Sequence, residues 1–60
     1  MFKVGDLVRI RPEWVREYEK IPVGIVTVRR IDGSMDVYWF ADRRVYESED
    51  PKAMILLNES

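Results

Sequence analysis

The chain has 60 residues, of which 47% are hydrophobic and 35% are charged, and its formal net charge is −1. This mixture is typical of a single small globular domain and is too apolar for a disordered chain. Because the sequence contains no Cys and no His, it excludes disulfides, thiolate zinc sites and histidine-based catalysis.

The first predicted strand spans about residues 4–11 and includes the turn signal Gly5-Asp6 near its start. Val8 and Ile10 alternate with two arginines, which gives the strand one apolar and one basic face. The spacing of turn signals in the rest of the chain is that of a small β-sandwich or β-barrel.

A long first loop is predicted between this strand and the next. Pro12 suits a first helical turn, and Trp14 and Tyr18 are spaced i, i+4, so we expect roughly two turns of helix before Lys20. Pro22 ends the segment, because the residue before a proline is disfavoured in a helix.

The second and third strands are predicted at about residues 23–31 and 35–41, joined by a hairpin turn at Asp32-Gly33. A two-residue loop at this position sets Ile31 opposite Ser34. On the inward face, the resulting pairs are Val28 with Val37 and Val26 with Trp39. On the outward face, they are Arg29 with Asp36, Thr27 with Tyr38 and Ile25 with Phe40.

A fourth strand is predicted at about residues 44–48, and its turn has two alternative lengths. A three-residue turn sets Val45 beside Trp39 in the core, whereas a two- or four-residue turn sets it beside Phe40. A short turn after Pro51, possibly of 3₁₀ type, then leads to a last strand at about residues 54–57, which we expect to close the barrel.

Three segments of this pattern resemble a known group of proteins. The strand Gly5-Asp6-Leu7-Val8-Arg9-Ile10, followed by Val23-Gly24-Ile25-Val26 and Val37-Tyr38-Trp39-Phe40, resembles small SH3-like barrels of the KOW type. Through Val8-Arg9-Ile10, the following Arg11-Pro12-Glu13 and Val23-Gly24-Ile25-Val26, the chain is more faintly similar to the ferredoxin-docking barrel subunit of photosystem I. Its first strand is also similar to the one that begins short phage-encoded proteins. The resemblance implies an all-β fold: a single five-stranded SH3-like barrel domain over residues 1–60 with a long, partly helical first loop.

The chemistry of the sequence favours binding over catalysis. No serine or threonine has a plausible base beside it, so we expect no enzyme activity, no cofactor and no metal site. The acidic group Glu47, Glu49 and Asp50 lacks the spacing of a calcium loop and is interpreted as a solvated turn. Without Cys, a recognisable signal peptide or a long apolar run, the chain is expected to be cytoplasmic and to have no membrane partner.

We therefore predict an adaptor or accessory subunit that docks a protein partner through an aromatic and arginine-rich surface, since Tyr, Trp and Arg dominate binding hot spots. The predicted surface comprises Trp14, Tyr18, Ile25, Tyr38, Phe40, Arg43, Arg44 and Tyr46. One question stays open at this point. Trp14 and Tyr18 either fold over the outward face that carries Ile25, Tyr38 and Phe40, or leave that face exposed.

Two alternative functions come from other features of the sequence. The first is a nucleic-acid-binding barrel, in which the basic stripe contacts phosphates. That stripe consists of Arg9, Arg11, Arg29 and Arg30. The second is a structural subunit of a larger assembly, such as a phage particle or a homo-oligomer, in which the strand edges or the open face are buried.

Overall fold

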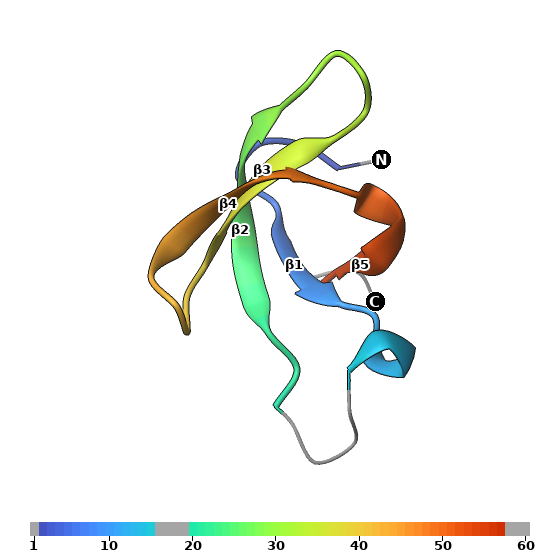
Figure 1. Ribbon diagram of the computed structural model, residues 1–60, viewed down its shortest axis with the longest axis vertical. Helices are drawn as coiled ribbons and strands as arrows, with labels where there is room; N and C mark the ends of the chain where they lie inside the picture. The colour runs from blue at the N-terminus through green and yellow to red at the C-terminus, as the bar shows by residue number, and fades with distance from the viewer. Residues whose placement is uncertain (1, 16–19, 58–60) are drawn as a thin grey trace.

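Five antiparallel strands form a single sheet in the computed structural model, which describes residues 2–15 and 20–57. The strands lie in the order β4–β3–β2–β1–β5 (Figure 1). They are β1 (Leu7–Ile10), β2 (Val23–Arg29), β3 (Met35–Trp39), β4 (Arg44–Glu49) and β5 (Met54–Leu56). Two 3₁₀ turns are also present, namely η1 (Pro12–Trp14) and η2 (Pro51–Ala53). The described residues are thus all-β, as predicted, and contain no α-helix.

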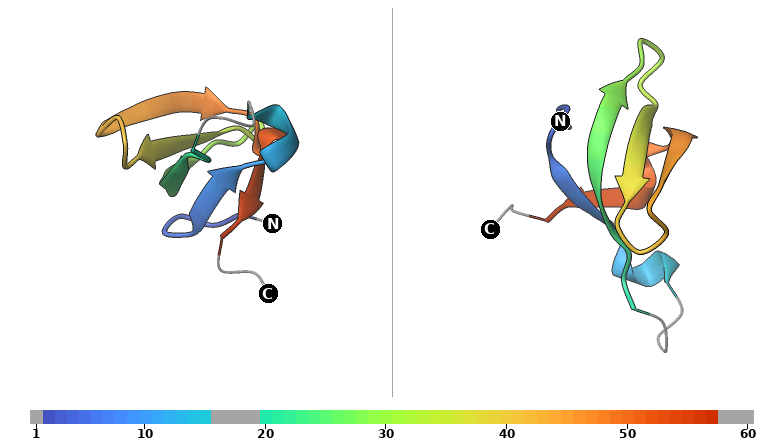
Figure 2. Two further views of the ribbon diagram at one scale, coloured as in Figure 1. Left: turned by 90° about the horizontal axis from the view of Figure 1, so that it is seen from below. Right: turned by 90° about the vertical axis from the view of Figure 1, so that its left-hand side faces the viewer.

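The sheet is strongly curled but remains open, so the predicted closure into a barrel is not observed. Within the described residues, β5 pairs only with β1 and β4 pairs only with β3, which leaves both as edge strands. Figure 2 shows the curl and the position of β4 and β5 at opposite ends of the sheet. β5 has only three residues, and all of them pair with β1.

The first loop begins with η1 and not with the two helical turns expected there. Pro12 occupies the first position of this turn, but Arg11 provides no side-chain cap, and Val15 is already extended with φ −114° and ψ 137°. A β-branched residue in this conformation ends the turn at Trp14. The remainder of the predicted helix, including Tyr18, lies outside the described residues.

The core lies on one face of the sheet, which we call the core face. Its fully or almost fully buried side chains are Val8, Val26, Met35, Val37, Trp39 and Met54. Burying each large apolar side chain stabilises the fold by about 1.5–3 kcal/mol. The inward positions predicted for Val26, Val37 and Trp39 are confirmed, but Val28 is 42% exposed and does not belong to the core.

The β2–β3 hairpin differs from the prediction because its loop has three residues, Ile31 to Gly33. The Arg30 N–H donates to the Ser34 carbonyl at 2.8 Å, and the Gly33 N–H donates to the Arg30 carbonyl at 3.0 Å. Gly33 has φ +95°, which a residue with a side chain rarely adopts. The Asp32 carboxylate accepts from the Ser34 N–H at 2.9 Å and from its hydroxyl at 2.7 Å, which fixes this longer turn.

A β-bulge on β2 then shifts the register a second time. Val26 lies opposite Val37, but Val28 lies opposite Asp36, so Thr27 is the extra residue. This shift explains why Val28 leaves the core. The predicted pairs therefore change: Ile25 lies opposite Tyr38 and not Phe40, and Asp36 is bound by Arg30 and not by Arg29.

The β3–β4 connection has the four-residue turn of one predicted alternative, but its register differs, because Val45 does not lie opposite Phe40. Trp39 lies opposite Arg44, and residues 40–43 form the turn, with Arg43 in the left-handed region at φ 56°. Its N–H donates to the Trp39 carbonyl at 2.8 Å. Val45 consequently lies opposite Tyr38, on the face away from the core, where it is 49% exposed. The core position of Val45 beside Trp39, which a three-residue turn predicts, is therefore wrong.

Gly24 provides a test of how closely the strands pack. A methyl group at this position would lie 2.6 Å from the Tyr38 carbonyl oxygen and 2.8 Å from Cε3 of Trp39. We expect Gly24→Ala to lower the free energy of unfolding by about 1–3 kcal/mol, as overpacking does. Urea denaturation measures this value, and Val28→Ala is the control, with an expected effect of about 0.5 kcal/mol or less. Equal stability of Gly24→Ala and the wild type would contradict this packing.

Candidate functional site

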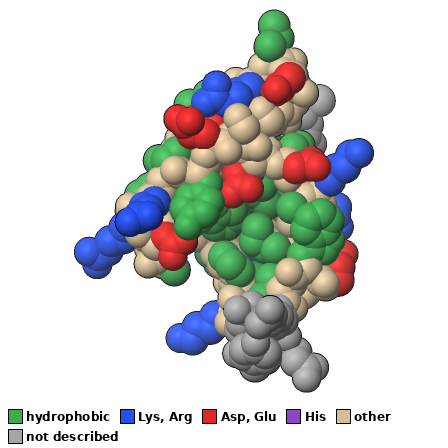
Figure 3. Space-filling model, in the orientation of Figure 1, with side chains coloured by type: hydrophobic (Ala, Val, Ile, Leu, Met, Phe, Trp, Pro, Cys, Tyr) green, Lys and Arg blue, Asp and Glu red, His purple; other side chains and the backbone are tan. Residues whose placement is uncertain are grey.

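A groove opens between the β3–β4 turn and the end of the first loop, with a volume of about 460 Å³. Figure 3 shows hydrophobic side chains gathered in the lower centre of this face, with acidic side chains beside them. Most of the lining side chains are aliphatic or aromatic. The groove is lined by Ile10, Lys20, Ile21, Pro22, Val23, Trp39, Phe40, Ala41, Asp42, Tyr46 and Glu49.

Two aromatic side chains of the groove are held by carboxylates. The Tyr46 hydroxyl donates to Asp42 Oδ2 at 2.7 Å, and the Trp39 Nε1–H donates to Glu49 Oε2 at 3.2 Å. Hydrogen bonding to Asp42, followed by its negative charge and by partial burial, raises the pKa of the Tyr46 phenol above its ordinary value. These contacts fix the orientation of both rings at the groove wall.

Phe40 adds the most exposed aromatic surface of the groove, because 46% of this residue is accessible to solvent. Tyr46 is 43% exposed, whereas Trp39 is only 5% exposed and contributes mainly to the floor. Ile21, at the mouth of the groove, is 36% exposed. The groove therefore presents apolar surface that is open to solvent in the described part of the chain.

A second β-bulge, on β4, determines which side chains reach the groove. Met35 lies opposite Glu49 and Val37 lies opposite Tyr46, so one residue more lies between the two positions on β4 than on β3. Ser48, within this bulge, has φ 58°. Because side chains alternate along a regular strand, Tyr46 and Glu49 would otherwise point to opposite faces. The extra residue places both on the core face, where they line the groove.

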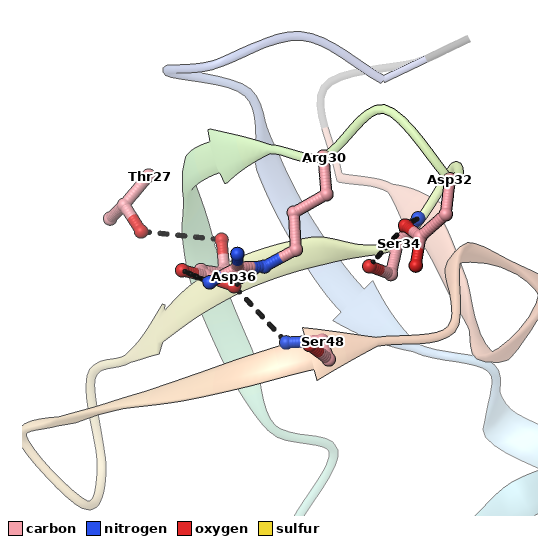
Figure 4. Close-up of polar contacts among 6 residues, drawn as sticks. All are labelled: Thr27, Arg30, Asp32, Ser34, Asp36 and Ser48. Atoms are coloured by element: carbon pink, nitrogen blue, oxygen red, sulfur yellow. Dashed lines mark hydrogen bonds and ion pairs between the residues drawn. The ribbon is translucent and has the colours of Figure 1, made fainter.

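Asp36 connects this bulge to the β2–β3 hairpin (Figure 4). Its carboxylate accepts two hydrogen bonds from the Arg30 guanidinium, at 2.9 and 2.8 Å, and one from the Ser48 N–H at 3.0 Å. The residue is only 5% exposed. The hydrogen bonds from Arg30, followed by that from Ser48, hold the pKa of the Asp36 carboxyl below its ordinary value.

The structure places most of the predicted partner-binding residues that it describes in two regions, which meet where the Tyr38 and Phe40 rings contact each other. Phe40 and Tyr46 line the groove, and between them along the chain lie the exposed Arg43, in the β3–β4 turn, and Arg44, at the start of β4. Sequence reasoning missed the other groove residues, which are Ile10, Lys20, Ile21, Pro22, Val23, Trp39, Ala41, Asp42 and Glu49. A short apolar segment beside a proline, at residues 21–23, was the available signal for part of this set.

Ile25 and Tyr38 lie instead on the outer face, opposite to the core face. Leu7, Ile25, Tyr38 and Val45 are directly opposite one another on successive strands and form a row across the sheet. The Tyr38 and Phe40 rings meet edge to face, with centroids 5.8 Å apart. Trp14 is 61% exposed. Tyr18, the other side chain considered as a cover for this face, lies outside the described residues.

The four arginines of the predicted basic stripe do not form one patch. Arg30 is bound to Asp36, and Arg11 donates from Nε to the Lys52 carbonyl at 2.6 Å. Arg9 lies opposite Val23 at the start of β2, whereas Arg29 ends that strand, about 20 Å away along it.

The described residues include no group of three or more acidic side chains placed to hold a metal ion. None of the helices in that part of the chain has the length and apolar character needed to cross a membrane. Comparisons with known protein families, with curated proteins and with solved structures find no match. The groove geometry is therefore the main guide to function.

The hydrogen bond between Asp42 and Tyr46 leads to a test by titration. In Asp42→Asn, the pKa of the Tyr46 phenol should fall toward the ordinary tyrosine value of about 10, because the carboxylate charge and acceptor are lost. The ¹³Cζ chemical shift of Tyr46 as a function of pH measures this change. Glu47→Gln removes a neighbouring carboxylate as a control, and an equal fall in both variants would argue against the specific contact.

The depressed pKa of Asp36 predicts an acid dependence of stability. The stabilisation that its carboxylate provides is fully present above the unfolded-state pKa of about 3.9 and is lost as pH falls through the lower folded-state value. Asp36→Asn should lower the thermal midpoint of unfolding at neutral pH by more than about 5 °C. Below about pH 4, the thermal midpoint of this variant should also fall less steeply with pH than that of the wild type. Glu13→Gln is the exposed control; an unchanged acid dependence in Asp36→Asn would refute this role.

Proposed function

We propose that this protein is a small non-catalytic binding module or accessory subunit, and that a segment of a protein partner lies in the groove. The observation that carries the proposal is the solvent-open groove of about 460 Å³ with Phe40 and Tyr46 in its wall. Its size is within the usual range for ligand sites, and exposed aromatic side chains of this kind are typical of binding hot spots.

The groove also suggests the chemistry of the segment that it binds. Its lining is mostly apolar, and its charged members are Lys20, Asp42 and Glu49. Asp42 and Glu49 each accept one hydrogen bond from an aromatic ring in the groove and keep further acceptor capacity. We therefore propose that the segment presents an apolar side chain to the groove and a lysine or arginine to its acidic side.

The resemblance to SH3-like barrels supports the same class of function. The five antiparallel strands and the pairing of the first strand with the last support this fold as a proposal. A shared fold alone does not define a ligand, so the functional argument depends on the groove itself.

A selection experiment tests the groove directly. Peptides from a random display library are selected on the wild-type protein, and those that also bind Phe40→Asp are removed. We expect the remaining peptides to carry apolar and basic residues, and to bind Phe40→Ala and Tyr46→Ala roughly tenfold or more weakly, equivalent to about 1.4 kcal/mol or more.

Val28→Ala is the matched control, because Val28 is similarly exposed, at 42%, but does not line the groove. Its affinity for the selected peptides should equal that of the wild type. The proposal would be refuted if no peptide depended on Phe40, or if Val28→Ala weakened binding as much as the groove variants.

A further inference from the structure

The edge strand β4 has one side without a partner. It pairs with β3, and no other described strand lies beside it (Figure 1). Its residues from Arg44 to Ser48 are all exposed. An edge strand presents backbone N–H and C=O groups that can pair with the strand of another molecule.

The charges along this edge are ordered in a self-complementary way. Arg44 begins the strand directly after the turn residue Arg43, Val45 and Tyr46 follow, and the acidic Glu47 comes next. When two copies of a strand pair in antiparallel orientation, the start of one lies opposite the later part of the other. The basic end of each copy would therefore face the acidic end of its partner, and opposite charges in such positions stabilise pairing.

The outer face provides a second, independent argument. Its apolar row of Leu7, Ile25, Tyr38 and Val45 crosses four neighbouring strands and ends at the β4 edge. Val45, the last member, is 49% exposed. A second copy that continued the sheet would cover this side chain and extend the row.

We propose that two copies of this chain pair antiparallel through β4, around a two-fold axis that passes between Val45 and the partner's Val45. This proposal does not depend on the ligand proposed for the groove, although the strand that it uses also carries the groove residue Tyr46. In this register Arg44 lies opposite the partner's Tyr46, and the turn residue Arg43, which directly precedes the strand, comes beside the partner's Glu47. The two sheets become one, and both apolar rows join at the axis.

The two-fold symmetry and the bulge restrict the alternatives. An antiparallel pair with this symmetry requires one residue to lie opposite itself. With Tyr46 at the axis, Val45 would face the partner's Glu47, and with Glu47 at the axis, two like charges would meet. In the Val45 register the regular pairing runs from Arg44 to Tyr46, between the turn residue Arg43 and the bulge at Ser48.

Sedimentation velocity over low micromolar to millimolar concentrations measures the association. The contact involves one short strand from each copy, so we expect a weak dimer that forms progressively with concentration. Val45→Lys, which brings two ammonium groups together at the axis, should abolish the dimer. Val28→Lys adds the same charge at an exposed position outside β4 and should leave it unchanged.

A charge exchange tests the register. Arg43→Glu and Glu47→Arg should each weaken dimerisation roughly tenfold. The reason is that each substitution brings like charges together at both symmetry-related contacts of the dimer. The double variant restores opposite charges and should recover dimerisation. A wild type that stays monomeric throughout the range, a dimer insensitive to Val45→Lys, or a double variant no better than the single ones would overturn the proposal.

Discussion

Asp36 lies on β3, between a bulge at Thr27 on the neighbouring strand β2 and a bulge at Ser48 on the edge strand β4. A bulge removes a backbone N–H from the regular ladder and leaves it in need of an acceptor. The Asp36 carboxylate accepts from the Ser48 N–H and is itself neutralised by two hydrogen bonds from Arg30. One almost fully buried carboxylate thus links the hairpin to the irregular part of β4 (Figure 4).

The groove depends on this arrangement because the bulge sets the direction of two of its side chains. Tyr46 and Glu49 share the core face only because β4 has an extra residue between them. Glu49 can then accept from the Trp39 indole, and Tyr46 can donate to Asp42. The hydrogen bond between Asp36 and the Ser48 N–H, on the outer face of the sheet, therefore supports the shape of the apolar groove on the core face.

The five strands and their approximate positions could be predicted from alternation and turn residues, and so could the burial of Val26, Val37 and Trp39. The register could not, because the Asp32 side chain stabilises a longer turn and because neither bulge residue has a distinctive sequence signal. Because the bulge on β4 has no sequence signal, Glu49 was interpreted as part of a solvated acidic turn. Its contact with Trp39 exists only once the chain has gained a residue at the bulge.

The most direct test of this account is the proton environment of the Trp39 indole, measured by nuclear Overhauser effects in the wild-type protein. The bulge predicts contacts from the Nε1–H to the side-chain protons of Glu49, and none to the β protons of Ser48. In a strand without the bulge, Ser48 would share the face of Tyr46 and Glu49 would point away. Contacts to Ser48 in place of Glu49 would contradict the proposed origin of the groove.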